Sequence, residues 1–214
     1  HEDLKDNMWE NAYQPKLRGE YGYDFANADT DPMDDEGHGT HCTGIIGAKG
    51  DNGVGVSGMN HNVKIMALKA LDENGSGSDS DLIDAYNYIN KAINLGVNVA
   101  AINDSWGGEG KSTIFKKLMD LVGAKGAVSV CAAGNESADN DETATYPAND
   151  DCAYKISVAA TNEKGELSNY SNYGKEKVDI AAPGSDILST YAEDCYNPSI
   201  YSAEKQKEVT QKLA

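Results

Sequence analysis

Short apolar runs rich in β-branched residues alternate with segments of helical period along most of this chain. Strands are expected at 63–71, 97–103, 127–133, 155–160 and 177–181. Helices are expected between them, at 81–95 and 112–124. This alternation is typical of parallel βαβ units and argues against a β-sandwich. We therefore predict an α/β fold, with one open parallel β-sheet and helices on both of its faces.

The helix expected at 81–95 has the clearest local signals. Ser78 to Asp81 supply side chains that cap a helix and suit its dipole, and Gly96 supplies the stop. The apolar face repeats at helical spacing and comprises Leu82, Tyr86, Ile89 and Ile93. The end of the chain, at about 202–213, also has helix-forming composition, so a helical tail is expected over 191–214.

Composition excludes two classes of function. The 214 residues carry a net charge of −17, and because affinity for nucleic acid rests largely on clustered Lys and Arg, nucleic-acid binding is not expected. No run approaches the roughly 20 apolar residues of a membrane-spanning helix, so no membrane span is expected. The length favours one domain over two, and no linker or repeat divides the chain.

The four cysteines give little information about the compartment. Cys42, Cys131, Cys152 and Cys195 permit three pairings if all are oxidised, and they lack the paired close spacing of a zinc site. Cys131 lies within an apolar run, which favours a buried free thiol.

Two segments contain residues suited to catalysis. His38 lies between glycines in segment 34–47, and a histidine at the start of a helix can be held neutral, as a general base requires. Asn135 follows the strand expected at 127–133, where its amide could donate to an oxyanion. Taken singly, His38 would be a structural histidine and Asn135 a turn residue.

Together with five further segments, these residues resemble the subtilisin family of serine endopeptidases. The matching segments occur in the family's order and cover about residues 1–190. They are Gly37-His38-Gly39-Thr40-His41, Gly53-Val54-Gly55-Val56-Ser57-Gly58, Asn103-Asp104-Ser105-Trp106-Gly107, Ala132-Ala133-Gly134-Asn135, Tyr146-Pro147-Ala148, Ser171-Asn172-Tyr173-Gly174 and Val178-Asp179-Ile180-Ala181-Ala182-Pro183-Gly184.

The resemblance implies a role for each part of the site. His38 would be the general base and acid, and Asn135 the side-chain oxyanion donor. An extended substrate peptide would pair as an added strand with Ser105, Trp106 and Gly107. The pocket for the residue before the cut would be lined by Ala132, Ala133 and Gly134.

Two of the family's motifs are missing. The triad aspartate belongs to an Asp-Thr/Ser-Gly motif and the nucleophile to a Gly-Thr-Ser-Met-Ala motif, and neither occurs here. The segment His1-Glu2-Asp3-Leu4 resembles the stretch that follows the aspartate motif. We therefore expect residues 1–214 to be a single truncated peptidase domain, incomplete at both ends and inactive in isolation.

Calcium is the cofactor that the acidic loops suggest. Asp24, Asp29 and Asp31 lie in a loop whose alternating oxygen donors suit a hard cation, although a solvated acidic turn explains them equally well. This loop is similar to a calcium loop of thermophilic-type subtilisins. The family resemblance implies a second site, in which Asn52 contributes its side chain and Asp3 its carboxylate.

The predicted function is hydrolysis of peptide bonds in extended polypeptides, through a Ser-His-Asp triad of which this chain holds only the histidine. The alternative is a non-catalytic, calcium-stabilised peptide-binding pseudoprotease. A flavodoxin-like module would require a phosphate-binding glycine loop, and none is found. Other expected partners are a propeptide or the remainder of the domain. The expected location is secreted or cell-surface, with the cytoplasm as the alternative.

Overall fold

A computed structural model of the chain describes residues 1–192, so the tail expected to be helical lies outside the described residues from 193 onward. The helices are α1 (His38–Gly47), α2 (Asp79–Asn94) and α3 (Thr113–Gly123), with a short 3-10 helix, η1 (Lys5–Asn7). The strands are β1 (Gly22–Asp24), β2 (Ala67–Lys69), β3 (Ala101–Asp104), β4 (Val128–Ala132), β5 (Lys155–Thr161) and β6 (Ile180–Pro183).

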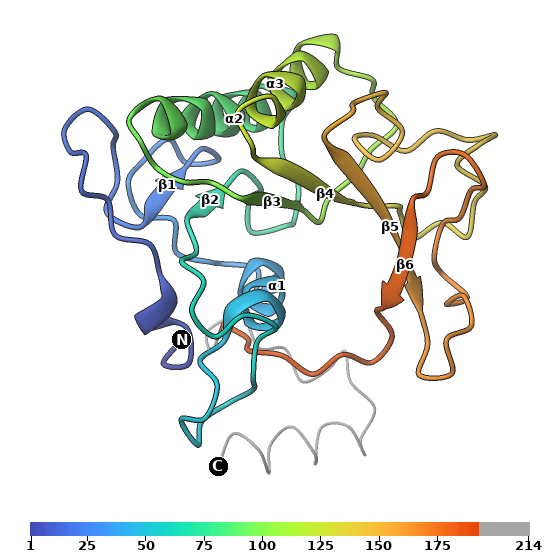
Figure 1. The fold of residues 1–214 in the computed structure, drawn as a ribbon, viewed down its shortest axis with the longest axis horizontal. Coiled ribbons are helices and arrows are strands. Elements are labelled where there is room, and N and C mark those ends of the chain that lie inside the picture. The colour runs from blue at the N-terminus through green and yellow to red at the C-terminus, as the bar shows by residue number, and fades with distance from the viewer. Residues whose placement is uncertain (193–214) are drawn as a thin grey trace.

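The strands are all parallel and form two sheets. One sheet pairs β1 with β2, and the other has the order β3-β4-β5-β6. Helices α2 and α3 cover one side of the sheets, and α1 lies on the other (Figure 1). The predicted α/β fold with helices on both faces is confirmed, but the strands are divided between two sheets.

The strands form two sheets because one edge of β2 and one edge of β3 have no partner strand within residues 1–192. Strand β2 pairs with β1 through alternate residues, and Ala67 donates its N–H to the Tyr21 carbonyl at 3.0 Å. The peptide groups of Leu68 therefore face the opposite edge. Strand β3 pairs with β4 through the even-numbered positions, which leaves Ala101 and Asn103 facing away from β4. Within residues 1–192, no strand pairs with either of these edges.

Strand β1 was not predicted from the sequence, because it has only three residues and begins with a glycine. Gly22 has a φ of 148°, and a Cβ built on it would lie 1.6 Å from the carbonyl oxygen of Ala67. Glycine is therefore required for the strands to approach each other here. Strand β5 is one residue longer than predicted, and the remaining strands are shorter than predicted or displaced by a few residues, as happens when only part of an apolar run pairs.

Helices α2 and α3 begin within two residues of their predicted starts. The Ser78 hydroxyl accepts from the N–H of Asp81 at 3.2 Å, and the Asp81 carboxylate accepts from the N–H of Ser78 at 3.4 Å, which forms a capping box for α2. The core between α2, α3 and the sheet contains Tyr86, Ile89, Phe115, Met119, Val122 and Cys131. Cys131 is a buried free thiol, as predicted.

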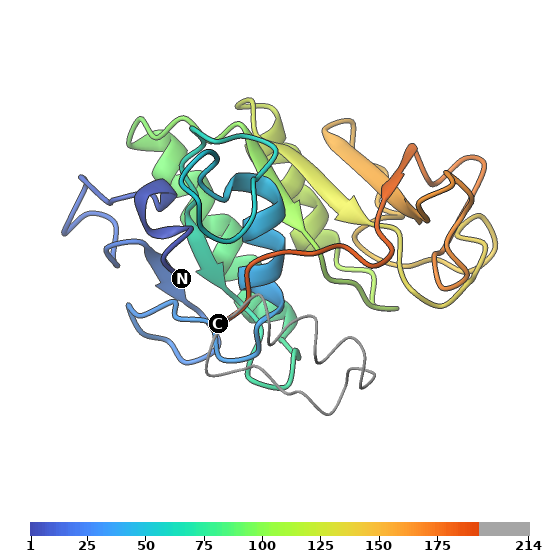
Figure 2. The same cartoon turned by 90° about the horizontal axis from the view of Figure 1, so that it is seen from below.

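The segment that follows β6 returns to α1 (Figure 2). The Ser189 and Thr190 hydroxyls donate to the carbonyl oxygens of His41 and Thr40 at 2.6 and 2.8 Å. A side-chain nitrogen of His41, Nε2, lies 3.0 Å from the Ile187 carbonyl oxygen. His41 therefore helps to hold this returning segment against α1.

Met119→Ala tests the contribution of the core. Met119 is fully buried on α3, so its truncation is expected to lower the free energy of unfolding by about 2–5 kcal/mol. Ile114→Ala, on the same helix at 61% exposure, is the matched control and should change it by no more than about 0.5 kcal/mol. Urea unfolding followed by circular dichroism measures both. Equal losses would contradict the assignment of this face to the core.

Candidate active site

The turn before α1 fixes the position of His38. Asp34 Oδ1 accepts from the N–H of Gly37 at 2.8 Å, and Oδ2 accepts from the N–H and hydroxyl of Thr40 at 2.8 and 2.6 Å. Partial burial alone would raise the pKa of Asp34, but hydrogen bonds from Thr40, Gly37 and Glu36 outweigh it and lower that pKa. The ionised carboxylate thus holds the first turn of α1 in place.

His38 is the exposed first residue of α1, and its N–H donates to Glu36 Oε2 at 2.8 Å. Its side-chain Nε2 lies 3.7 Å from Cys42 Sγ, one helical turn further on. The hydrogen bond with Cys42 is the largest influence on the pKa of His38 and raises it, against partial burial, which lowers it. The carboxylates of Glu36 and Asp34 add to the increase.

The segment Ser105–Gly107 leaves β3 with its backbone free. In the part of the chain that the structure describes, the peptide groups of Ser105, Trp106 and Gly107 form no hydrogen bond. The next residue, Gly108, exchanges backbone hydrogen bonds with Tyr146 at 2.9 and 2.8 Å, so the end of the segment is anchored. An anchored extended segment with free peptide groups can accept a peptide as an added strand.

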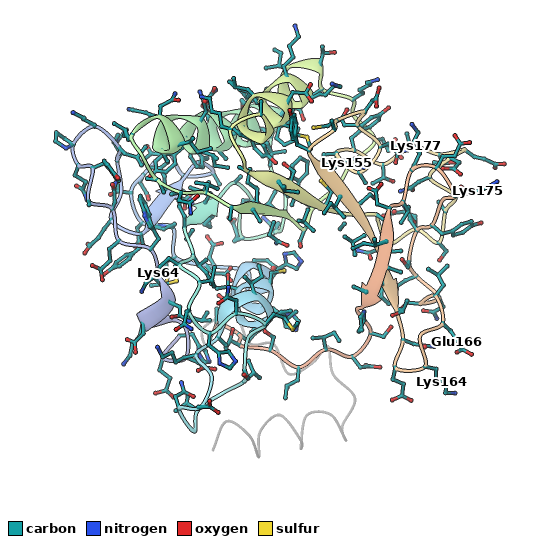
Figure 3. The ribbon with its side chains drawn as sticks, in the orientation of Figure 1. Lys64, Lys155, Lys164, Glu166, Lys175 and Lys177 are labelled. Atoms are coloured by element: carbon teal, nitrogen blue, oxygen red, sulfur yellow. The ribbon has the colours of Figure 1, made fainter. Side chains whose placement is uncertain are left out.

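His38 and Ser105–Gly107 line the same large open cleft. The free edges of β2 and β3 line it too, together with Cys42 and the stretch 186–191 that runs beside α1. The outer edge of the β5–β6 side lies away from α1 and carries Lys164, Lys175 and Lys177, which do not line the cleft (Figure 3). Two of the predicted site elements, His38 and Ser105–Gly107, therefore border the same cleft.

Asn135 and its neighbours, the other predicted site residues, lie outside the set of residues that line this cleft. Ala132, Ala133 and Gly134 lead from β4 to Asn135, which is exposed. Gly134 has a φ of 119°, and a Cβ there would lie 2.3 Å from Asn172 Nδ2. Glycine is therefore required at this turn.

Asn172 holds the loop that carries Asn135. Its side chain is fully buried, and its Oδ1 accepts from the N–H groups of Glu136 and Ala138 at 2.9 and 3.0 Å. Its Nδ2 donates to the carbonyl oxygen of Ala133 at 3.2 Å and to Glu136 Oε2 at 2.8 Å. One side chain thus fixes both ends of the turn around Asn135.

Asp3 and Asn52, 49 residues apart in sequence, are in contact. Asp3 is 1% exposed, and its Oδ1 accepts from Asn52 Nδ2 at 2.7 Å while its Oδ2 accepts from the N–H of Val56 at 2.9 Å. Asp3 thus lies against the loop that carries Asn52, and the two side chains would offer oxygen atoms to a hard cation if the Asn52 amide presented its oxygen.

The Asp24 loop has a different electrostatic arrangement. Asp24 and Asp29 exchange backbone hydrogen bonds, and Asp29 Oδ1 accepts from the N–H of Asp31 at 2.8 Å. The Asp24 carboxylate is 3.1 Å from Lys69 Nζ and also accepts two hydrogen bonds from Asn27. Lys69 Nζ is also 3.1 Å from Asp35 Oδ2, so its single positive charge is shared by two carboxylates and would compete with a cation bound at Asp24.

The family model of the subtilases matches residues 1–212. The chain belongs to the subtilase family. It is 41% identical over 185 residues to the "Thermophilic serine proteinase" of Bacillus sp. strain AK1, and 36% identical over 184 residues to "Thermitase" of Thermoactinomyces vulgaris. A crystal structure of a cold adapted subtilisin-like serine proteinase, 30% identical, superposes with a TM-score of 0.70 over 89% of the chain and 65% of that protein.

The subtilase chain spans only part of its relatives. The matches cover 85% of this chain in both relatives, but 43% of the Bacillus sp. proteinase and 62% of thermitase. The "Minor extracellular protease Epr" of Bacillus subtilis is 37% identical over 82% of this chain and 25% of that protein. In the described part of this subtilase chain, no helix is both long and apolar enough to cross a membrane.

Sequence reasoning missed three residues that organise the site. Asn172 lies within a segment that matched the family, but nothing in the sequence indicated its six hydrogen bonds. Asp34 could have been found as an Asx-turn residue, because an Asp side chain often accepts from the N–H two residues on, as Oδ1 does from Glu36 at 3.1 Å. Asp104 gave no local signal, because its partners Tyr86 and Cys131 are distant in sequence.

Cys42→Ala is expected to lower the pKa of His38, because it removes the largest influence that raises it. A histidine whose pKa is raised on folding stabilises the folded state below its unfolded pKa, and this stabilisation is lost as pH rises through the folded pKa. Cys42→Ala should therefore reduce stability more at acidic than at alkaline pH. NMR titration of the His38 ring measures the pKa, and Cys152→Ala is the control. An unchanged His38 pKa in Cys42→Ala would contradict the assignment.

Proposed function

We propose that this chain provides the general base and the peptide-binding segment of a subtilisin-like serine endopeptidase that cuts extended polypeptides. The observation that carries the proposal is that His38 and the free backbone of Ser105–Gly107 line one cleft. A substrate paired with this segment would run past the imidazole, which could take a proton from a nucleophile and return it to the leaving amine.

Asn135 is the proposed oxyanion donor. Its side chain forms no hydrogen bond within residues 1–192, so the amide is available to a substrate. Asn172 and Gly134 hold the turn, and a donor held in advance stabilises a developing oxyanion without reorganisation. Ala132, Ala133 and Gly134 are the proposed wall of the pocket for the residue before the cut.

The chain alone is proposed to be inactive, and to need the remainder of the domain as its partner. The sequence has no Gly-Thr-Ser motif to supply the nucleophile. The free edges of β2 and β3 support this proposal, because both line the cleft and each could pair with a further strand. A secreted or cell-surface location is proposed from the relative named as extracellular, with the cytoplasm as the alternative.

The test is to sequence the coding DNA on both sides of residues 1–214 and to express the longer polypeptide. The 214-residue chain is expected to show no hydrolysis of casein, whereas a longer polypeptide with Asp-Thr-Gly and Gly-Thr-Ser motifs is expected to hydrolyse it. Asn135→Ala in that polypeptide should lower kcat by about 10²- to 10³-fold, the range known for loss of an oxyanion donor in subtilisin itself. Asn169→Ala, which changes an exposed asparagine, is the control.

Two results would contradict this function. If start and stop codons flank residues 1–214, the protein lacks a nucleophile, and the peptide-binding pseudoprotease becomes the better interpretation. If the longer polypeptide has both motifs but Asn135→Ala retains full kcat, the role of Asn135 is wrong.

Calcium is proposed to bind beside Asp3 and Asn52, where it would stabilise the fold without taking part in the reaction. The support is the buried Asp3 carboxylate, which no described cation neutralises. Asp24, Asp29 and Asp31 are proposed as a second, weaker calcium site, in which the Lys69 ammonium competes with the cation for Asp24.

Calcium is therefore expected to raise the melting temperature of the chain. A cation present at 100 times its Kd stabilises the folded state by about 2.7 kcal/mol. Asp3→Asn should abolish the increase, whereas Asp6→Asn, which changes an exposed aspartate, should retain it. Differential scanning calorimetry with and without millimolar calcium measures the shift. The absence of any shift in the unsubstituted chain would remove calcium from the proposal.

A further inference from the structure

A buried carboxylate lies directly before the proposed peptide-binding segment. Asp104 is the last residue of β3, and only 2% of it is exposed. Among the described residues no Lys or Arg forms an ion pair with it. A buried acid without a cation is costly unless it is hydrogen-bonded, so its partners must account for its presence.

The two oxygens of Asp104 serve different elements. Oδ2 accepts from the Tyr86 hydroxyl of α2 at 2.6 Å and from Cys131 Sγ of β4 at 3.9 Å. Oδ1 accepts from the indole Nε1 of Trp106 at 3.1 Å. The carboxylate therefore connects the helix layer and the neighbouring strand to a side chain of the peptide-binding segment.

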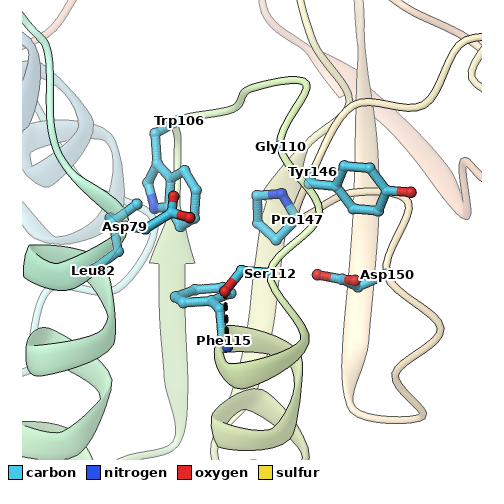
Figure 4. Close-up of a pocket in the computed structure, with 9 residues that line it drawn as sticks. All are labelled: Asp79, Leu82, Trp106, Gly110, Ser112, Phe115, Tyr146, Pro147 and Asp150. Atoms are coloured by element: carbon cyan, nitrogen blue, oxygen red, sulfur yellow. Dashed lines mark hydrogen bonds between the residues drawn. The ribbon is translucent and has the colours of Figure 1, made fainter.

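Trp106 carries this connection to the surface where a peptide would bind. Its ring packs edge-on against Phe115 of α3, with centroids 5.2 Å apart. It also forms one wall of a pocket, with Leu82 of α2 on one side and Pro147 on the other (Figure 4). A rotation of the indole would thus change the shape of the pocket, and the contacts of the indole anchor the Ser105–Gly107 segment through the Trp106 side chain.

We propose that Asp104 is a positioning residue for peptide binding: it holds the Trp106 indole, and through it the Ser105–Gly107 segment and the pocket wall, in a binding-ready arrangement. This inference rests on the proposed function for the role of the segment, but the contact between Asp104 and Trp106 can be tested separately. It also makes the arrangement sensitive to pH, because protonation removes the negative charge that the indole N–H faces.

The surroundings identify Asp104 as the group that would titrate. Burial raises its pKa to about 6, although hydrogen bonds from Tyr86, Trp106 and Cys131 each lower it. The other titratable groups that face it are Tyr86 from α2 and Cys131 from β4, and burial raises the pKa of both. Neither of these groups changes its charge between pH 4.5 and 8.

Asn is the informative substitution at this position. Its oxygen can accept from the Trp106 indole while its NH₂ group donates to the Tyr86 oxygen. Tyr86 can then donate to Ser129 Oγ, which lies 2.8 Å away. Asp104→Asn therefore preserves the contacts without a titrating group, whereas Asp104→Leu removes both contacts at similar volume.

The first experiment is NMR of the indole N–H of Trp106 in the full chain, with Trp9→Phe to leave one tryptophan. The signal is expected to titrate with a midpoint near pH 6. Asp104→Asn should abolish this titration, and Tyr86→Phe should raise the midpoint because a hydrogen bond that favours the ionised form is lost. A signal that does not titrate, or a titration that persists in Asp104→Asn and so reports a histidine, would overturn the proposal.

The second experiment measures binding of tetrapeptide amides by calorimetry at pH 5 and pH 8. We expect the Kd of the unsubstituted chain to be a few-fold higher at pH 5. Asp104→Leu should raise the Kd about 5- to 20-fold at pH 8, and Asp104→Asn should restore most of the affinity and remove the pH dependence. Asp84→Asn, which changes an exposed aspartate of α2, is the control.

The outcomes separate this proposal from the proposed function. If Asp104→Leu remains folded by circular dichroism and binds peptide as well as the unsubstituted chain, the positioning role is wrong. If the unsubstituted chain binds no peptide, both the peptide-binding function and the role of Asp104 in it fail. In that case the NMR titration still decides whether Asp104 holds Trp106.

Discussion

Backbone pairing between parallel strands is the constraint on which the rest of this structure depends. A parallel strand has peptide groups on both edges, and such strands are normally covered on both faces and paired on both sides. Here β1 pairs with β2 and β3 to β6 pair in a second sheet, so β2 and β3 are each paired on one edge only. Their other edges, at Leu68 in β2 and at Ala101 and Asn103 in β3, have no partner strand within residues 1–192. The proposed catalytic histidine and the proposed peptide-binding segment line the cleft that these edges share.

The sequence predicted the elements whose signals are local. Helix α2 was predicted because its cap, its apolar face and its terminal glycine are adjacent in sequence, and the structure confirms all three. The single predicted sheet was wrong in detail, because strand order and strand edges depend on contacts such as that between Gly22 and Ala67, which lie 45 positions apart (67 − 22). No periodicity reports such a contact.

The same distinction applies to the candidate site. His38, Ser105–Gly107 and Asn135 were found from motifs, but the residues that hold them were found only in three dimensions. Asn172 and Asp104 are buried polar side chains whose hydrogen bonds reach across the fold, so their sequence neighbours do not indicate their roles. Calcium ligation gives a further example: Asp24 stays a predicted ligand, and the Lys69 ammonium that lies 3.1 Å from its carboxylate is seen only in the structure.

The buried Asp104 carboxylate lowers the stability of the fold at neutral pH. A carboxyl group whose pKa rises on folding binds more protons in the folded state than in the unfolded state between about pH 4 and 6, so stability falls as pH increases through that range. At neutral pH the fold thus carries a buried charge that an apolar side chain of similar volume would avoid. Stability alone does not explain this carboxylate. Its position does, because no apolar side chain can accept hydrogen bonds from Tyr86 in the helix layer and from Trp106 beside the cleft at the same time.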